Sequence, residues 1–144
     1  MERVKINLPT NFSFCYSTTI RLSDLNYGNH VGNDKYLTLL QEARMAFLQS
    51  KLYTELNIDG VGIVVADAAI EYKKELFYND EIKIYVQAAN FISIGFDLFY
   101  KVEVIKNDLP IIVAKAKTGI VTFDYINRKK KSLSQQAINK LSEM

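Results

Sequence analysis

The feature that most constrains the fold is a stretch of about sixty residues that contains strand-like segments and little else. Polar and apolar residues alternate within it, which is typical of strands with one buried face. The segments are joined by short links rich in Asn, Asp or Pro, and links this short connect antiparallel neighbours. The pattern predicts four long antiparallel strands, over residues 62–74, 80–89, 93–105 and 111–123.

One long helix is predicted before these strands, over residues 34–51, with Asn33 as its N-cap and Asp34 complementing the positive end of its dipole. Its apolar residues cover well over half of its circumference, whereas a surface helix shows a narrower stripe. We therefore expect an antiparallel sheet wrapped around one long central α-helix. A first strand is predicted over residues 14–22 and a closing helix over residues 134–142.

One helix cannot cover both faces and both edges of such a sheet. A second copy of the chain that buries the remaining edge or face satisfies the pattern. The sequence thus predicts an obligate homodimer or a larger even-numbered assembly such as a homotetramer.

Length and composition narrow the class of protein. The 144 residues fit a single domain over positions 1–144, and an apolar fraction of 49% is typical of a globular chain. The single cysteine, Cys15, excludes an intrachain disulfide and fits a reducing compartment. The first residues are charged, and every apolar stretch is far shorter than the ~20 residues of a membrane span. We expect a cytoplasmic protein without membrane insertion.

The only concentrated charge is the basic run at residues 128–131. It is either a solvated turn before the closing helix or a docking point for an anionic ligand such as a nucleotide phosphate. With a net charge of +2 and no recognisable motif, the chain lacks the broad basic footprint of a nucleic-acid module. No nucleic-acid partner is expected.

The densest polar segment, residues 23–33, leads directly into the predicted long helix and holds Asp24, Asn26, Asn29, the only histidine, His30, and Asn33. The N–H groups at a helix start have no partner within the helix and can polarise a carbonyl oxygen. The segment is either a loop held by Asx turns or a catalytic loop, and the number of polar groups favours the second. One histidine and one cysteine cannot assemble the usual metal clusters, so no metal or cofactor is expected.

Three further charged residues interrupt apolar surroundings. Glu42 lies in the predicted buried helix, where a carboxylate forms a structural ion pair, with Arg44 considered as its partner, or belongs to a site. Asp67 follows the apolar run 61–66, and is either satisfied at a sheet edge or bulge, or functional.

A family resemblance emerges at these residues. The stretch 20–47 reads IRLSDLNYGNHVGNDKYLTLLQEARMAF, and it resembles the 4-hydroxybenzoyl-CoA thioesterase-like branch of the hotdog superfamily. The shared pattern is D-x-D-x-x-G-H-V-x-N-x-x-Y followed by E-A-R, and the likeness extends over about residues 14–128. The matching positions are Asp24, His30, Val31, Asn33, Tyr36, Glu42, Ala43 and Arg44.

The resemblance implies an α+β hotdog fold, dimerised edge to edge, with the active site at the dimer interface. It also implies hydrolysis of an acyl thioester of coenzyme A or of an acyl carrier protein. A hotdog dehydratase is a weaker reading, because its histidine-bearing helix motif is not evident. By the same resemblance, Asn33 marks an oxyanion site, and contacts to the substrate come from Tyr36, Leu40, Glu42 and, at the coenzyme A phosphates, Arg128, Lys129 and Lys130.

One departure from the family pattern bears on mechanism. The second aspartate of the pattern is Asn26 here, and an amide can act neither as a base nor as a carboxylate nucleophile. Asn26 would then orient water or the thioester carbonyl, and His30 would position water or the leaving thiol. The catalytic carboxylate would be Asp24 or Asp67, the latter on the strand that reaches the partner's site in this fold. The alternative function is a hotdog module that binds acyl thioesters without turnover.

Overall fold

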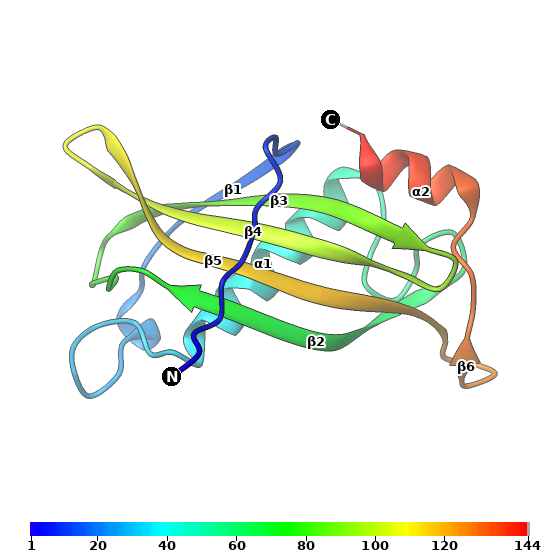
Figure 1. Ribbon diagram of the computed structural model, residues 1–144, viewed down its shortest axis with the longest axis horizontal. Coiled ribbons are helices and arrows are strands. Elements are labelled where there is room, and N and C mark those ends of the chain that lie inside the picture. Colours follow the sequence, from blue (N-terminus) through cyan, green and yellow to red (C-terminus); the bar gives the residue numbers. More distant parts are fainter. Residues whose placement is uncertain (144) are drawn as a thin grey trace.

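The computed structural model describes residues 1–143, as one antiparallel sheet curved around one long helix (Figure 1). The helix is α1 (Lys35–Ser50), preceded by a 3-10 turn (Leu22–Asp24) and followed late in the chain by α2 (Gln135–Ser142). The strands are β1 (Phe14–Thr19), β2 (Gly62–Tyr72), β3 (Glu81–Ile92), β4 (Gly95–Lys106), β5 (Leu109–Asp124) and the two-residue β6 (Lys129–Lys130). The predicted sheet around one long central helix is confirmed.

The strand order in the sheet is β1-β3-β4-β5-β2, with β6 beside β5 and every pair antiparallel. The links predicted to be tight turns contain residues with positive φ, namely Asn79, Asn90, Asn107 and Asp108. Asn and Asp tolerate this left-handed region because their short side chains bond nearby backbone groups. β6 was not predicted, because two residues carry no periodic pattern.

Helix α1 packs one face against the sheet, and its buried residues include Leu39, Leu40, Ala43, Phe47 and Leu48. Its outward face is also apolar in part, since Leu37 and Met45 are 47% and 53% exposed. The helix begins one residue later than predicted. Asp34 rather than Asn33 occupies the N-cap position, and within residues 1–143 its side chain makes no capping hydrogen bond.

Arg44 is the one charged residue buried on α1, and it lies in a polar network beneath the helix. Its Nε donates to Glu55 Oε1 at 2.9 Å, and its guanidinium also donates to the Tyr100 hydroxyl. That hydroxyl is hydrogen-bonded to Thr118 Oγ1 at 2.9 Å. Arg44 thus pairs with Glu55 and not with Glu42, and its buried charge is both neutralised and hydrogen-bonded.

The first thirteen residues cross the face of the sheet opposite α1 (Figure 1). The Ile6 N–H donates to Glu71 Oε1 at 3.0 Å, and the Ser13 N–H donates to Gln87 Oε1 at 2.8 Å. None of the helices within residues 1–143 is long and apolar enough to cross a membrane.

The packing of α1 predicts a sharp contrast between two identical substitutions. Leu48 on α1 is 0% exposed, whereas Leu109 at the start of β5 is 66% exposed. Leu48→Ala should lower the free energy of unfolding by about 2–5 kcal/mol, because it removes buried methyl groups and leaves a cavity. Leu109→Ala should change it by less than about 0.5 kcal/mol. Denaturant unfolding measures both, and equal effects would contradict the burial of this face of α1.

Candidate active site

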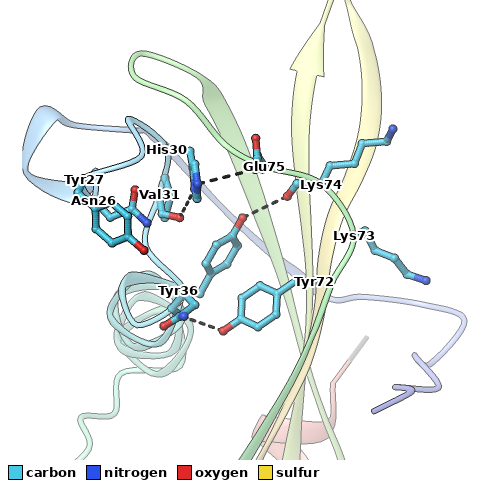
Figure 2. Close-up of a pocket in the computed structure, with 10 residues that line it drawn as sticks. Asn26, Tyr27, His30, Val31, Tyr36, Tyr72, Lys73, Lys74 and Glu75 are labelled. Atoms are coloured by element: carbon cyan, nitrogen blue, oxygen red, sulfur yellow. Dashed lines mark hydrogen bonds and ion pairs between the residues drawn. The ribbon is translucent and has the colours of Figure 1, made fainter. Parts of the chain in front are cut away.

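A cavity of about 430 Å³ lies where the loop before α1 meets the segment that follows β2 (Figure 2). It brings together four residues that the sequence singled out, Asn26, His30, Asn33 and Tyr36. The full lining consists of Asn26, Tyr27, His30, Val31, Asn33, Tyr36, Tyr72, Lys73, Lys74 and Glu75.

Backbone hydrogen bonds hold the loop in a small hairpin and attach it to the segment after β2. The Asn26 N–H donates to the His30 carbonyl at 2.8 Å, and Asn29 turns the chain with a φ of 63°. The Val31 N–H then donates to the Leu76 carbonyl at 2.9 Å, and His30 forms an antiparallel bridge with Phe77. The position of His30 is therefore set by main-chain contacts on both sides of the cavity.

Asn26 and Gly28 shape the space beside the histidine. The Gly28 N–H donates to Asn26 Oδ1 at 2.8 Å, which orients the amide oxygen toward Gly28 and leaves the NH₂ group to donate elsewhere. A methyl group on Gly28 would lie 3.0 Å from His30 Nε2 and 3.2 Å from Asn26 Oδ1. Any side chain at position 28 would therefore crowd both polar atoms.

His30 presents one ring nitrogen to the cavity as an acceptor. Its Nδ1 lies 3.2 Å from the Val31 carbonyl oxygen, which can only accept, so Nδ1 carries the proton in the neutral ring. Nε2 is then the unprotonated nitrogen. It faces Glu75 Oε1 at 3.7 Å (Figure 2).

Two tyrosines join the start of α1 to the end of β2. The Tyr72 hydroxyl donates to the Asn33 carbonyl at 2.8 Å, and the Tyr36 hydroxyl donates to the Lys74 carbonyl at 3.4 Å. Their rings meet edge to face with centroids 5.1 Å apart. Burial raises the pKa of Tyr36 to about 12, with smaller effects from Tyr72 and Glu75. Tyr36 is thus a hydrogen-bond donor and not a base near neutral pH.

Asp24 and Glu42 do not line the cavity. The buried Asp24 carboxylate accepts the Arg21 N–H at 2.8 Å, and the Arg21 guanidinium donates to Glu42 Oε1 at 3.1 Å. The two carboxylates thus share one arginine, which gives Glu42 an ion-pair partner other than Arg44. Leu40 is 1% exposed in the core and is also outside the lining.

Asp67 lies on the edge strand β2, at a shift of register between Val65 and Asp67. Its carboxylate accepts hydrogen bonds from Lys117 Nζ and the Gly119 N–H, both at 2.9 Å, and the bond from Lys117 lowers the pKa of Asp67. The edge and the bulge considered from the sequence are both present. Asp67 lines a separate hollow, so in one chain it does not reach His30.

The basic run is also remote from the cavity within one chain. Lys129 and Lys130 form β6 beside the end of β5, at the opposite end of the molecule from the loop before α1 (Figure 1). The roles predicted for Asp67 and for Arg128, Lys129 and Lys130 therefore require a partner subunit, and they stay predictions.

The sequence did not predict Tyr72 and Glu75 as site residues. Both follow from the position of the segment after β2, which the bridge between His30 and Phe77 brings against the loop. In the sequence, residues 70–80 read IEYKKELFYND, a strand end and a turn with charges on both sides. No local signal distinguishes Glu75 from its charged neighbours.

Comparison with known proteins identifies the family of the chain. Residues 20–141 match the model of the thioesterase-like superfamily. The chain belongs to this superfamily. A curated relative from Aquifex aeolicus, named "Putative esterase", is 32% identical over 107 residues, which cover 73% of this chain and 80% of the relative.

Two solved structures show the same fold. A hypothetical protein from Aquifex aeolicus superposes with a TM-score of 0.78 at 28% identity, over 90% of this chain and 99% of its own. A 1,4-dihydroxy-2-naphthoyl-CoA thioesterase from Synechocystis superposes with a TM-score of 0.78 at 20% identity, over 89% and 94% of the two chains. The predicted hotdog fold is confirmed.

The raised pKa of Tyr36 predicts a pH dependence of stability. The folded state holds the phenolic proton more tightly than the unfolded state, where the ordinary pKa is 10.0. The stabilisation is complete below about pH 10 and is lost as the pH rises toward about 12. Tyr36→Phe should therefore reduce the decline of unfolding free energy over this range, measured by denaturant unfolding at several pH values. Tyr78→Phe is the exposed control, and an unchanged slope in Tyr36→Phe would contradict the assignment.

Proposed function

We propose that the chain hydrolyses the thioester of an acyl group carried by coenzyme A or by an acyl carrier protein. The main support for the proposal is that His30 and the start of α1 line the same cavity, and that the chain is a member of the thioesterase-like superfamily. The acceptor nitrogen of His30 is available there as a base. The name of the Synechocystis neighbour, a thioesterase for an acyl-CoA, supports the same class of reaction.

The start of α1 and Asn26 are suited to bind the thioester carbonyl oxygen. The first N–H groups of a helix have no acceptor within the helix, and they lie at the end where the dipole favours negative charge. Asn33 lines the cavity at this point, and Asn26 directs its NH₂ group away from Gly28. Donors placed in this way stabilise the oxyanion that develops when a nucleophile attacks the carbonyl carbon.

Water is the nucleophile that these residues can activate. Asn26 cannot attack or take a proton, whereas the neutral His30 ring offers Nε2 as a base. Removal of a proton from water by His30 lets the water oxygen attack the carbonyl carbon. Collapse of the tetrahedral intermediate breaks the C–S bond, and the imidazolium returns the proton to the leaving sulfur. The products are a carboxylic acid and a thiol.

Asn26 is also the residue that favours the alternative, an acyl-thioester binding module without turnover. An acyl-CoA and acyl-carrier-protein panel, monitored by release of free thiol, separates the two functions. Thiol release with at least one substrate supports the esterase. Saturable binding of the panel with no thiol release would support the binding module instead.

His30→Ala tests the role of the histidine. Loss of a general base should lower kcat by about 10²–10⁴-fold. Leu109→Ala changes an exposed residue at the start of β5 and is the control for effects of substitution and purification that do not involve the site. It should keep the wild-type kcat. Thiol release measures both variants, and wild-type turnover in His30→Ala would exclude the proposed mechanism.

We infer further that two copies associate through β2. Within residues 1–143, β2 has a neighbour on one side only, and Val64 and Val65 on it are 39% and 41% exposed. An open strand edge with exposed apolar residues is a template for pairing with another chain. Association at this edge would also cover part of the apolar outward face of α1, where Leu37 and Met45 are exposed.

Sedimentation equilibrium tests this association. The wild-type protein should have twice the mass of one chain, or a larger even multiple. Val65→Lys, which adds a charge to the β2 edge, should shift the distribution toward the single chain. Ile126→Lys adds the same charge at an exposed position outside β2 and should leave the mass unchanged. A single-chain mass for the wild-type protein would refute the association.

A further inference from the structure

We propose that Glu75 supplies the carboxylate that Asn26 cannot supply, and that Glu75 and His30 hold the attacking water between them. This inference rests on the proposed hydrolysis of a thioester. It assigns a catalytic role to the segment after β2, which the family pattern around the loop does not include.

The separation of the two side chains fits a bridging water. His30 Nε2 and Glu75 Oε1 lie 3.7 Å apart, beyond the usual length of a direct hydrogen bond. Both atoms are acceptors, because Nδ1 carries the proton of the neutral ring. A water molecule beside the pair has two hydrogens to give, and it can donate one to each acceptor.

Glu75 is well placed for this role. Among the described residues it is the only carboxylate that lines the cavity. Its side chain is directed toward His30, whereas those of Lys73 and Lys74 point away (Figure 2). Asp24, the nearest alternative by sequence, has its carboxylate engaged by Arg21 outside the cavity.

The backbone on both sides of Glu75 is fixed, although its side chain is 62% exposed. The Lys74 N–H donates to the Val113 carbonyl at 3.1 Å. On the other side, Leu76 is fully buried, and its carbonyl accepts the N–H of Val31, the residue next to His30. The same contact that positions the histidine thus positions the glutamate opposite it.

The lack of a side chain at Gly28 leaves the unprotonated nitrogen of His30 uncrowded. A methyl group at Gly28 would lie 3.0 Å from Nε2, which is tighter than ordinary van der Waals contact. The same methyl group would lie 3.2 Å from Asn26 Oδ1. A side chain at position 28 would therefore crowd the atom that must contact the water.

The resulting step balances. His30 Nε2 takes one proton of the water, while the second hydrogen stays on the water oxygen and forms a hydrogen bond to the Glu75 carboxylate. The water oxygen forms a bond to the carbonyl carbon, and the carbonyl electron pair moves to oxygen. The Glu75 charge stabilises the imidazolium until the C–S bond breaks and the sulfur takes its proton. Glu75 keeps its own protonation state throughout.

Glu75→Gln is the direct test, with release of thiol from an acyl-CoA as the readout. It should lower kcat on the order of 10²-fold and leave KM close to the wild-type value, because glutamine has the same shape but is a poorer acceptor and carries no charge. Glu81→Gln removes the same charge from an exposed position at the start of β3, outside the cavity, and should retain wild-type kcat. Equal kcat for Glu75→Gln and Glu81→Gln would overturn the inference.

Two further variants distinguish a catalytic carboxylate from a merely structural one. Glu75→Ala should regain part of its kcat when formate is added, because the exposed site admits a small carboxylate. Asn26→Asp in the Glu75→Gln background should also raise kcat, but only in part, because it places a carboxylate near His30 Nε2 while it removes the amide donor of Asn26. Failure of both to raise kcat would contradict the assignment.

Gly28→Ala tests the position of the water itself. The added methyl should lower kcat by at least about tenfold while binding of the coenzyme A portion persists. Wild-type kcat in Gly28→Ala would overturn the inference. The outcomes separate the two proposals: a wild-type protein that releases no thiol refutes the proposed function, whereas turnover that needs His30 but not Glu75 refutes only this inference.

Discussion

The site depends on one backbone contact, the hydrogen bond from the Val31 N–H to the Leu76 carbonyl at 2.9 Å. It attaches the loop before α1 to the segment after β2, and it places His30 and Glu75 on opposite sides of one cavity. Both ends of the contact are anchored, since Val31 and Leu76 are buried in the core. A backbone bond shielded from water holds its geometry better than a bond between exposed side chains, which gives the catalytic groups a fixed spacing.

The polar groups of the molecule divide into structural and site residues by their partners. Arg44, Glu55 and Tyr100 satisfy one another beneath α1, and Arg21 contacts both Asp24 and Glu42 outside the cavity lining. Such saturated groups have little capacity left to bind a substrate. His30 Nε2 and Glu75 face each other without a direct hydrogen bond, at a distance that a water can bridge. This difference, rather than the type of residue, identifies the reactive part of the loop.

The sequence predicted the features that depend on local pattern. Alternation in residues 80–89 predicted a strand, asparagines marked the turns, and the polar segment 23–33 marked the loop that contains His30. It did not predict Glu75, because that residue enters the cavity through the pairing of His30 with Phe77, which no local pattern encodes. The partner of Arg44 was missed for the same reason, since Glu55 lies in a loop whose path depends on the whole sheet.

A crystal structure with a non-hydrolysable acyl-CoA analogue tests the central claim most directly. We predict that the acyl carbon replacing the thioester carbon lies in the cavity between the loop and the end of β2, within about 3.5 Å of a water held by His30 and Glu75. Its oxygen should point toward the start of α1. An analogue bound with its acyl carbon in the hollow beside Asp67 or Lys117, and with this cavity unfilled by the ligand, would contradict the account.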